Sequence, residues 1–307
     1  MKFLDTAYVD AFAEEHRFPQ EARTCFVDLT RRLLANPENA EAFEAVCSGY
    51  MFPEAHDPKI ALENLKPIAE KSGTHGYTIN MLFWILCGKE LRERYAAQRI
   101  DSQIFFDTME DLRCKLNECI ECKGVCGSFV NDWFHGFYCM NRFALGRFQY
   151  GKDNLWADYR MPDGTVIPAG TRCMNFHIPS SGVPLTDEVR FDSYRRAYRF
   201  FKDYFDSDLM VLTCSSWLLY DKHREFLPKS SNILKFMDDF DIVAYKEREG
   251  FGDGWRVFGK YADLPFDRLP EDTSLRKAYK EWLIKTGKSG GGTGVIVFDG
   301  EKIVNKR

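Results

Sequence analysis

Residues 177–186, His-Ile-Pro-Ser-Ser-Gly-Val-Pro-Leu-Thr, have the composition of a loop that binds a ligand through its backbone. The loop joins an extended run at residues 171–178 to a helical pattern that starts near Asp187. Small residues and hydroxyls let backbone N–H groups approach a ligand, and the following helix N-terminus favours an anion. Asp187 and Glu188 oppose a closely bound anion, although they are also ordinary helix-start residues. The candidate contacts are Ile178, Ser180, Ser181 and Gly182.

His177 lies at the end of the same expected strand, and its imidazole has two interpretations. Beside Ser180 and Ser181 it is a candidate base, whereas a histidine at a strand end is also commonly a hydrogen-bonded structural group. A Ser/His/acid hydrolase is disfavoured because the chain has no Gly-x-Ser-x-Gly elbow around these serines.

A second polar cluster, Cys214-Ser215-Ser216-Trp217, ends the apolar run at residues 209–214. In a doubly wound or mixed sheet, this strand end faces the same crevice as the loop at 177–186. We expect Cys214 to be a buried neutral thiol. Ser215 and Ser216 are the better candidates for contact with a ligand.

Cysteines 114, 119, 122 and 126 give a competing signal, because four thiolates within thirteen residues can hold zinc or an iron–sulfur centre. Against a metal, Cys119 and Cys122 lie at a predicted helix end, and the chain has six further cysteines. Residues 285–289 resemble the end of a phosphate-binding Walker A loop. Trp282 stands where the first glycine is required, and a helix precedes the segment where a strand is needed.

Residues 174–245 read as strand, helix, strand, helix, strand, which predicts right-handed crossovers and at least two parallel strand pairs. The first helix has an aromatic face and a basic face, and the basic face, which includes Arg190, is either solvated or steers anions. Turn signals at 162–164 and 299–300 predict two hairpins, the second of type I′ after a glycine-rich loop at 287–294. We also expect a short strand at 255–259 and a helix from Ser274 to Gly287.

Residues 1 to about 125 show helical spacing of apolar residues throughout, with no strand pattern and no convincing repeat. The structural interpretation of this part is a helical bundle that packs on or caps the other domain. The glycines at 124 and 127 mark a composition break. We therefore expect two domains, residues 1–125 and 126–307.

Composition limits the class of protein. The chain has 307 residues, 45% of them hydrophobic, which suffices for a sizeable core in about two domains. A net charge of −4 does not favour nucleic acid or an anionic membrane as a partner. No apolar run reaches membrane-spanning length, and the start of the chain lacks the pattern of a signal peptide. Ten scattered cysteines fit free thiols in a reducing cytoplasm.

With these residues in place, the second half resembles a family of two-domain bacterial GNAT-like acyltransferases. The similarity covers roughly residues 128–245, and the helical first third fits the layout of that family. The matching motifs are His177-Ile-Pro-Ser-Ser-Gly182 with Leu185-Thr186, Ser193, Phe200-Phe201-x-x-Tyr204-Phe205, Cys214-Ser-Ser-Trp-Leu-Leu219 and Ser231-Asn-Ile-Leu-x-Phe236.

The resemblance implies an α/β (α+β) fold, with an all-helical N-terminal domain followed by a mixed β-sheet flanked by helices. It also implies acetyl-CoA or another acyl-CoA as co-substrate, bound where two strands part, and an amine acceptor that attacks the thioester directly. In that scheme His177 is the candidate base, and Ser215 or Ser216 is a candidate partner for the leaving thiol. The cofactor contacts would be Ile178, Ser180, Ser181, Gly182, Cys214, Trp217 and Asn232.

Two departures from typical GNAT enzymes keep an alternative open. The usual pyrophosphate loop is replaced by Pro179-Ser-Ser-Gly182, and the helix after Ser231 has no tyrosine where a general acid is common. We therefore expect a cytoplasmic N-acyltransferase for a small-molecule amine, without metal, nucleic acid or membrane. The alternatives are a non-catalytic ligand- or protein-binding protein on the same scaffold and a thiol-metal protein. The sequence leaves the oligomeric state open.

Overall fold

The computed structural model describes residues 2–52 and 56–306. Its backbone contacts divide the chain into two compact units, residues 1–143 and residues 144–307. No helix in the described ranges is both long enough and apolar enough to cross a membrane.

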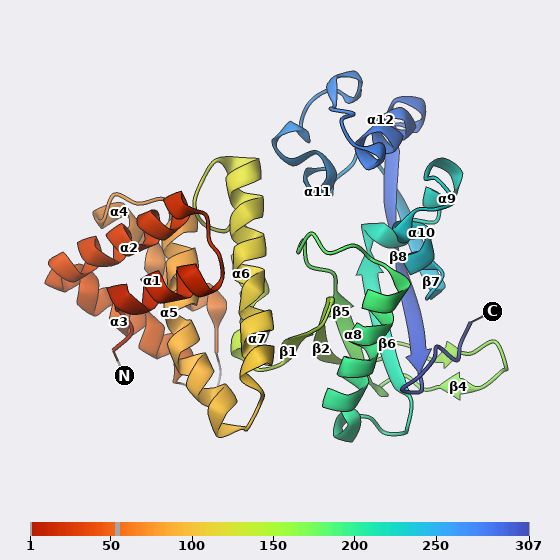
Figure 1. Cartoon of the computed structure of the whole chain (residues 1–307), viewed down its shortest axis with the longest axis horizontal. Helices are drawn as coiled ribbons and strands as arrows, with labels where there is room; N and C mark the ends of the chain where they lie inside the picture. Colours follow the sequence, from red (N-terminus) through yellow and green to blue (C-terminus); the bar gives the residue numbers. More distant parts are fainter. Residues whose placement is uncertain (1, 53–55, 307) are drawn as a thin grey trace. The chain divides into compact units, whose positions relative to one another are not determined.

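The first unit is helical, which confirms the expected fold class for this part of the chain (Figure 1). Each of four helices begins with an aspartate or asparagine whose side chain accepts a backbone N–H of the first turn: Asp5, Asn36, Asp57 and Asp101. The helices are α1 (Thr6–Glu15), α2 (Gln20–Ala35), α3 (Pro37–Met51), α4 (Pro58–Lys71), α5 (Gly76–Ala97) and α6 (Ser102–Lys123), followed by η1 (Asn131–Phe134) and α7 (His135–Tyr138).

The last helices of this unit explain where it ends. Trp84 of α5 is fully buried, and its ring lies 5.8 Å from that of Phe134 and 4.8 Å from that of Tyr138. Residues 126–143 therefore pack with the helical unit, and the compact units divide between Phe143 and Ala144, later than the glycine break suggested. The glycine break has a local role, because Gly124 ends α6 in the left-handed conformation.

The second unit is built on a six-stranded mixed sheet in the order β1-β2-β5-β6-β8-β7. Its strands are β1 (Arg142–Leu145), β2 (Phe148–Asn154), β5 (Arg172–His177), β6 (Met210–Ser216), β7 (Asp241–Glu249) and β8 (Lys288–Phe298), while β3 (Tyr159–Arg160) and β4 (Val166–Ile167) form a separate hairpin. Its helices are α8 (Asp187–Phe200), η2 (Lys202–Tyr204), η3 (Trp217–Leu219), α9 (His223–Phe226), α10 (Asn232–Met237), α11 (Trp255–Phe258), η4 (Gly259–Tyr261), η5 (Phe266–Arg268) and α12 (Ser274–Thr286).

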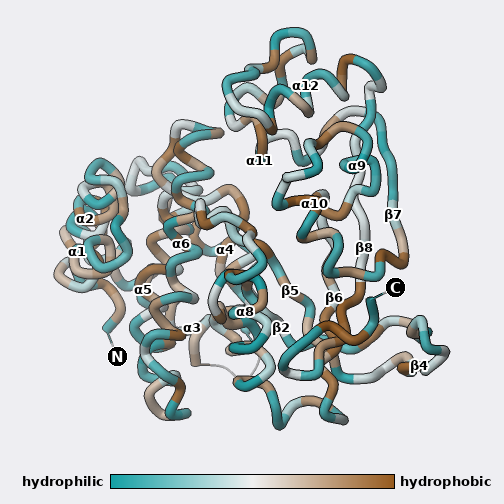
Figure 2. Tube along the Cα trace, turned by 45° about the vertical axis from the view of Figure 1, so that its right-hand side comes forward, coloured by the Kyte–Doolittle hydropathy of each residue, from teal (hydrophilic) through white to brown (hydrophobic). Residues whose placement is uncertain are grey.

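Of the pairs β2–β5, β5–β6, β6–β8 and β7–β8, only β5–β6 is parallel, so the expectation of at least two parallel pairs was wrong. The last strand, β8, inserts between β6 and β7 and is antiparallel to both. Its glycine-rich first part, residues 288–294, was expected to be a loop, whereas residues 295–298 were expected to be extended. The tube is pale along these glycines and brown along Val295-Ile-Val-Phe298 (Figure 2).

The two faces of the sheet are covered differently. On one face Tyr194 of α8 stacks on Phe148 of β2, and Phe240 stacks on Phe176 of β5. On the other face the β3–β4 hairpin adds Tyr159 and Ile167 to a core with Val211 and Val297, among other residues. The same face carries polar side chains near the ends of β5 and β6, of which Thr213 is buried and Ser215 is exposed.

Four local expectations have clear outcomes. The hairpin around residues 162–164 and the helix ending at Gly287 are confirmed. Residues 255–258 are helical rather than extended, because Val257 and Phe258 pack against Tyr279 and Leu283 in a small separate core. The turn after Phe298 is not of type I′, since Gly300 has a positive φ but Asp299 does not.

Candidate functional site

The candidate site begins where the two central strands part. The β5–β6 register contains two pairs, Met174 with Leu212 and Asn175 with Thr213. Beyond these, β5 pairs only with β2, and β6 pairs only with β8. The strand ends therefore have backbone groups on facing edges with no partner strand between them.

The two faces at this point differ. Phe240 closes the face that carries α8, because its ring lies against both Phe176 and the backbone of Gly294. On the opposite face, the strand register places polar residues next to one another. The pairs are Gln149 with His177, Asn175 with Thr213, and Ser215 with Thr293. A ligand that enters between the strands would therefore reach the polar face.

The loop at residues 178–186 is held by two arginines through its carbonyl groups. Arg147 donates to Pro179 O and Val183 O, both at 2.9 Å, and Arg190 donates to Leu185 O at 2.7 Å. In residues 2–52 and 56–306, the backbone N–H groups of Ser181 and Gly182 donate no hydrogen bond. Gly182 has φ +79°, a conformation that suits glycine. Three carbonyls of the loop are thus occupied, while the N–H groups of Ser181 and Gly182 are available to a ligand.

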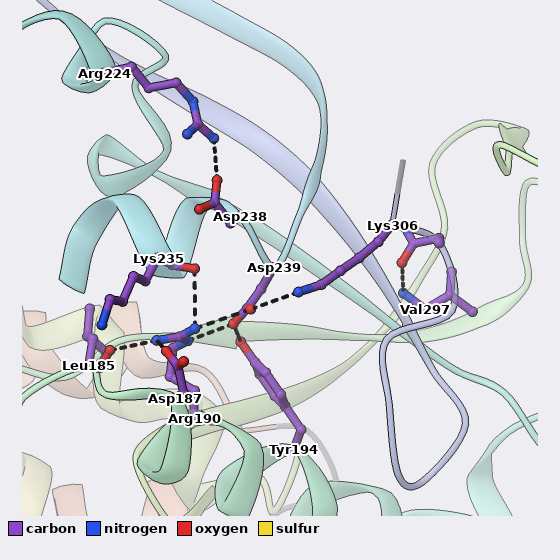
Figure 3. Close-up of polar contacts among 11 residues, drawn as sticks. Leu185, Asp187, Arg190, Tyr194, Arg224, Lys235, Asp238, Asp239, Val297 and Lys306 are labelled. Carbon is purple, nitrogen blue, oxygen red and sulfur yellow. Dashed lines mark hydrogen bonds and ion pairs between the residues drawn. The ribbon is translucent and has the colours of Figure 1, made fainter. Parts of the chain in front are cut away.

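Arg190 is at the centre of a buried network that joins α8 to the end of α10 (Figure 3). The sequence analysis placed it on the basic face of its helix, but its side chain is only 2% exposed. Its Nε lies 2.6 Å from Asp239 Oδ2 and its second terminal nitrogen 3.2 Å from Asp239 Oδ1. Tyr194 donates a further hydrogen bond to Asp239 at 3.0 Å. Asp239 is thus engaged structurally and is no candidate for the unnamed general acid.

The same arginine also pairs with one of the acidic residues at the start of α8, which would repel a bound anion. Asp187 Oδ1 lies 3.1 Å from Arg190, so the charge of this carboxylate is offset within its own helical turn. Thr186 provides the N-cap by accepting from Val189 N at 3.5 Å. This pairing weakens the repulsion of an anion at the helix start, where Glu188 remains as an acidic residue.

His177 is the last residue of β5, one residue earlier than the expected strand end at Ile178. Its partner in the register is Gln149 on β2, whose side chain is 1% exposed. The imidazole thus lies on the polar face beside the parting strands, and its role as base stays a prediction.

The cluster at residues 214–217 divides into different roles. Cys214 is buried, and burial raises the pKa of its thiol to about 12, which confirms the expectation of a neutral thiol. Ser216 Oγ accepts from Leu218 N and caps η3, so this hydroxyl has a structural function. Ser215 is exposed and hydrogen-bonds Thr293 Oγ1 at 2.7 Å, so of the two serines it is the one presented to a ligand.

The remaining predicted contacts lie beside this cluster. Trp217 packs against Tyr279 and Phe251 in the small core and also lines a surface cavity. Asn232 is the first residue of α10, whose cap is Ser231. Sequence reasoning missed Arg147 and Gln149. The available signal was that Arg147 and Gln149 alternate with the aromatic residues Phe148 and Tyr150 at the start of a predicted strand.

The cavity beside Ser215 has a volume of about 330 Å³ and lies over the ends of β6, β8 and β7. It is lined by Ser215, Ser216, Trp217, Ala244, Tyr245, Lys246, Arg248, Asp253, Gly291, Gly292 and Thr293. Of these, the sequence analysis had selected only Ser215, Ser216 and Trp217.

The four clustered cysteines do not form a metal site in the described residues, where no group of three or more His, Cys, Asp or Glu is suitably placed. Cys114 and Cys119 are buried in α6, while Cys122 and Cys126 are partly exposed. Burial raises the pKa of Cys114 to about 12 and that of Cys119 to about 11. The geometry of the described residues therefore gives no support to the thiol-metal alternative.

In the second unit the parallel strands β5 and β6 part beside a loop with two available backbone donors, and the domain is GNAT-like. Family models agree: residues 7–140 match the N-acyltransferase N-terminal domain, and residues 143–296 match the GNAT-like C-terminal domain. The chain therefore belongs to the family of N-acyltransferases that have a GNAT-like C-terminal domain, and it is an N-acyltransferase. This confirms the resemblance and disfavours the non-catalytic alternative.

Solved structures show the same fold. A mutant acyltransferase in complex with octanoyl-CoA is 19% identical with a TM-score of 0.68, covering 95% of this chain and 86% of that one. An acyltransferase with decanoyl-CoA and teicoplanin is also 19% identical with a TM-score of 0.68, over 93% and 86%. An acyltransferase with CoA and 10C-teicoplanin is 23% identical with a TM-score of 0.60, over 91% and 88%. A search of curated proteins found no match.

Proposed function

We propose that this chain transfers the acyl group of an acyl-CoA to the amino group of a small-molecule acceptor. The observation that carries the proposal is the parting of β5 and β6 after Asn175 and Thr213. Parted strands can accept the extended pantetheine arm, whose amide groups pair with free strand edges as another strand would.

The loop at residues 178–186 supplies the complementary anion site. The N–H groups of Ser181 and Gly182 and the start of α8 favour the negative charge of a pyrophosphate. Arg147 and Arg190 fix the loop through its carbonyls, so these donors are oriented before a ligand arrives.

The reaction follows from this placement. The amine nitrogen attacks the thioester carbonyl carbon, the C–N bond forms, the C–S bond breaks, and CoA leaves as a thiolate. Backbone N–H groups near the end of β5 would stabilise the developing oxyanion. His177 would take the proton lost by the amine, and a proton must return to the thiolate.

The proposal is tested by thermal unfolding with CoA, acetyl-CoA, octanoyl-CoA and decanoyl-CoA. A ligand at 100 times its dissociation constant adds about 2.7 kcal/mol of stability, which raises the melting temperature by several degrees. Absence of a response to all four compounds would remove the proposal.

Two matched variants locate the site. Ser181→Pro removes the backbone N–H and should weaken acyl-CoA binding about tenfold, whereas Ser181→Ala removes only the hydroxyl and should bind nearly as the wild type does. His177→Ala should leave the thermal shift unchanged and lower kcat by about 10²–10⁴. Equal loss of binding in both Ser181 variants would mean that the backbone donor is not used.

A further inference from the structure

The cavity over the ends of β6, β8 and β7 has a lining that is unusual for this sheet. Ser215, Thr293 and Ala244 lie side by side across the three strands, and Gly291 pairs with Lys246 in the next row. The floor is therefore largely backbone and hydroxyl groups, with Trp217 and Tyr245 at its sides. Such a surface suits a polar molecule that lies flat against it.

The charged residues of the cavity favour an anionic ligand. Its lining contains two cations, Lys246 and Arg248, and one carboxylate, Asp253. Arg248 lies 2.6 Å from Asp253, so these two charges offset each other. Across residues 2–52 and 56–306, Lys246 has no carboxylate within ion-pair distance, although Glu247 next to it bonds Lys288 and Tyr220. One exposed ammonium group is left for a ligand.

The cavity adjoins the place where β5 and β6 part. Ser215 is two residues beyond the last β5–β6 pair and on the same face of the sheet as Thr213. Because strands lie about 4.8 Å apart and rise about 3.3 Å per residue, Lys246 Cα lies roughly 12 Å from Ser215 Cα. Because β6 and β7 are both antiparallel to β8, they run in the same direction. Lys246 therefore lies beyond Ser215 along the chain direction of β6.

We propose that this cavity is the acceptor site and that Lys246 selects acceptors that carry a carboxylate or another anion several ångströms from the reacting amine. The inference rests on the proposed function, because it places the amine at the thioester between the strands. The ammonium group of Lys246 binds the anion, and Ser215 and Thr293 offer hydroxyls to the polar groups between the two ends.

The test compares paired acceptors of which one carries an added carboxylate-bearing group: benzylamine with 4-(aminomethyl)benzoate, and glucosamine with muramic acid. Binding to CoA-saturated protein is measured by calorimetry, and kcat/KM is measured with the acyl-CoA that gives the largest thermal shift. The variants are Lys246→Ala, Lys246→Arg and the control Lys277→Ala, which removes an exposed lysine outside the cavity.

In the wild type and in Lys277→Ala, at least one carboxylate-bearing acceptor should bind about fivefold more tightly than the compound of the same pair that lacks the carboxylate. Lys246→Ala should abolish this preference and leave the Kd of acyl-CoA unchanged, and Lys246→Arg should retain it. Equal binding within both pairs, absence of binding by all four compounds, or a preference that survives Lys246→Ala would overturn the inference. If the proposed function itself is wrong, no variant shows a thermal shift with acyl-CoA, and this outcome is distinguishable from a failure of the present inference.

Discussion

At the scale of single residues, the buried pair Arg190–Asp239 links stability to the ligand loop. Both side chains are 2% exposed, and Arg190 also donates to the carbonyls of Leu185 and Lys235. A buried charge that loses its partner is strongly destabilising. The pair therefore holds the ends of α8 and α10 together and fixes the carbonyl side of the loop at 178–186.

We predict that Arg190→Met lowers the free energy of unfolding by about 3–5 kcal/mol, because Asp239 keeps only Tyr194 and the distant Lys306. It should also reduce the thermal shift with acyl-CoA. Urea unfolding followed by circular dichroism and fluorescence measures the loss. The control is Arg196→Met, whose partner Asp192 is half exposed, and a change above about 1 kcal/mol there would undermine the comparison.

A second residue, His223, makes stability depend on pH. It is fully buried among Trp217, Phe226 and Tyr279, and its Nε2 hydrogen-bonds Tyr279 OH. Burial lowers its pKa to about 4. In the unfolded chain the pKa is about 6.5, so between these values only the unfolded state binds the proton. The stability due to neutral His223 is present above pH 6.5 and is lost as the pH falls towards 4.

We predict that the wild type loses roughly 3 kcal/mol more stability than His223→Phe between pH 7 and pH 4. The measurement is urea unfolding of both proteins at half-unit steps of pH. Parallel pH profiles would show that His223 is not kept neutral by the fold.

At the scale of elements, the glycines of β8 explain how a short helix can lie against a strand. A Cβ on Gly292 would collide with the carbonyl of Leu219 in η3, and a Cβ on Gly294 would lie 2.7 Å from the ring of Phe240. The glycines thus give η3 and Phe240 their positions beside the parting strands. The sequence analysis assigned these glycines to a loop because glycine disfavours strands unless close packing requires it.

We predict that Gly292→Ala destabilises the protein by about 1–3 kcal/mol and lowers acyl-CoA binding, since η3 must move away from β8. Gly49→Ala is the matched control. A Cβ at Gly49 meets nothing within 4 Å in α3, so this change should stabilise by about 0.5–1 kcal/mol. Thermal unfolding of both variants decides the matter, and a neutral Gly292→Ala would contradict the assigned packing role.

At the scale of the whole molecule, local signals predicted the helices and the hairpin at 162–164, because caps and turn residues act within a few positions. The loop at 177–186 and the strand ending at Ser216 were found in the same way. The insertion of β8 between β6 and β7 was not predictable, since it depends on pairing across more than forty residues. The burial of Arg190 and the position of Lys246 in the cavity were not predicted for the same reason: their partners or neighbours are distant in sequence.

The ten cysteines provide a test that covers the whole chain. Six are buried, and the other four, Cys25, Cys122, Cys126 and Cys139, are partly exposed. Burial raises the pKa of Cys173 and that of Cys114 to about 12, so these two thiols stay protonated at pH 8, and burial shields all six from a reagent. We therefore predict that Ellman's reagent labels at most four thiols in the native protein and all ten in denaturant. Metal analysis of the same sample should find less than one equivalent of zinc or iron. A stoichiometric metal whose removal exposes Cys114 and Cys119 to the reagent would restore the thiol-metal alternative.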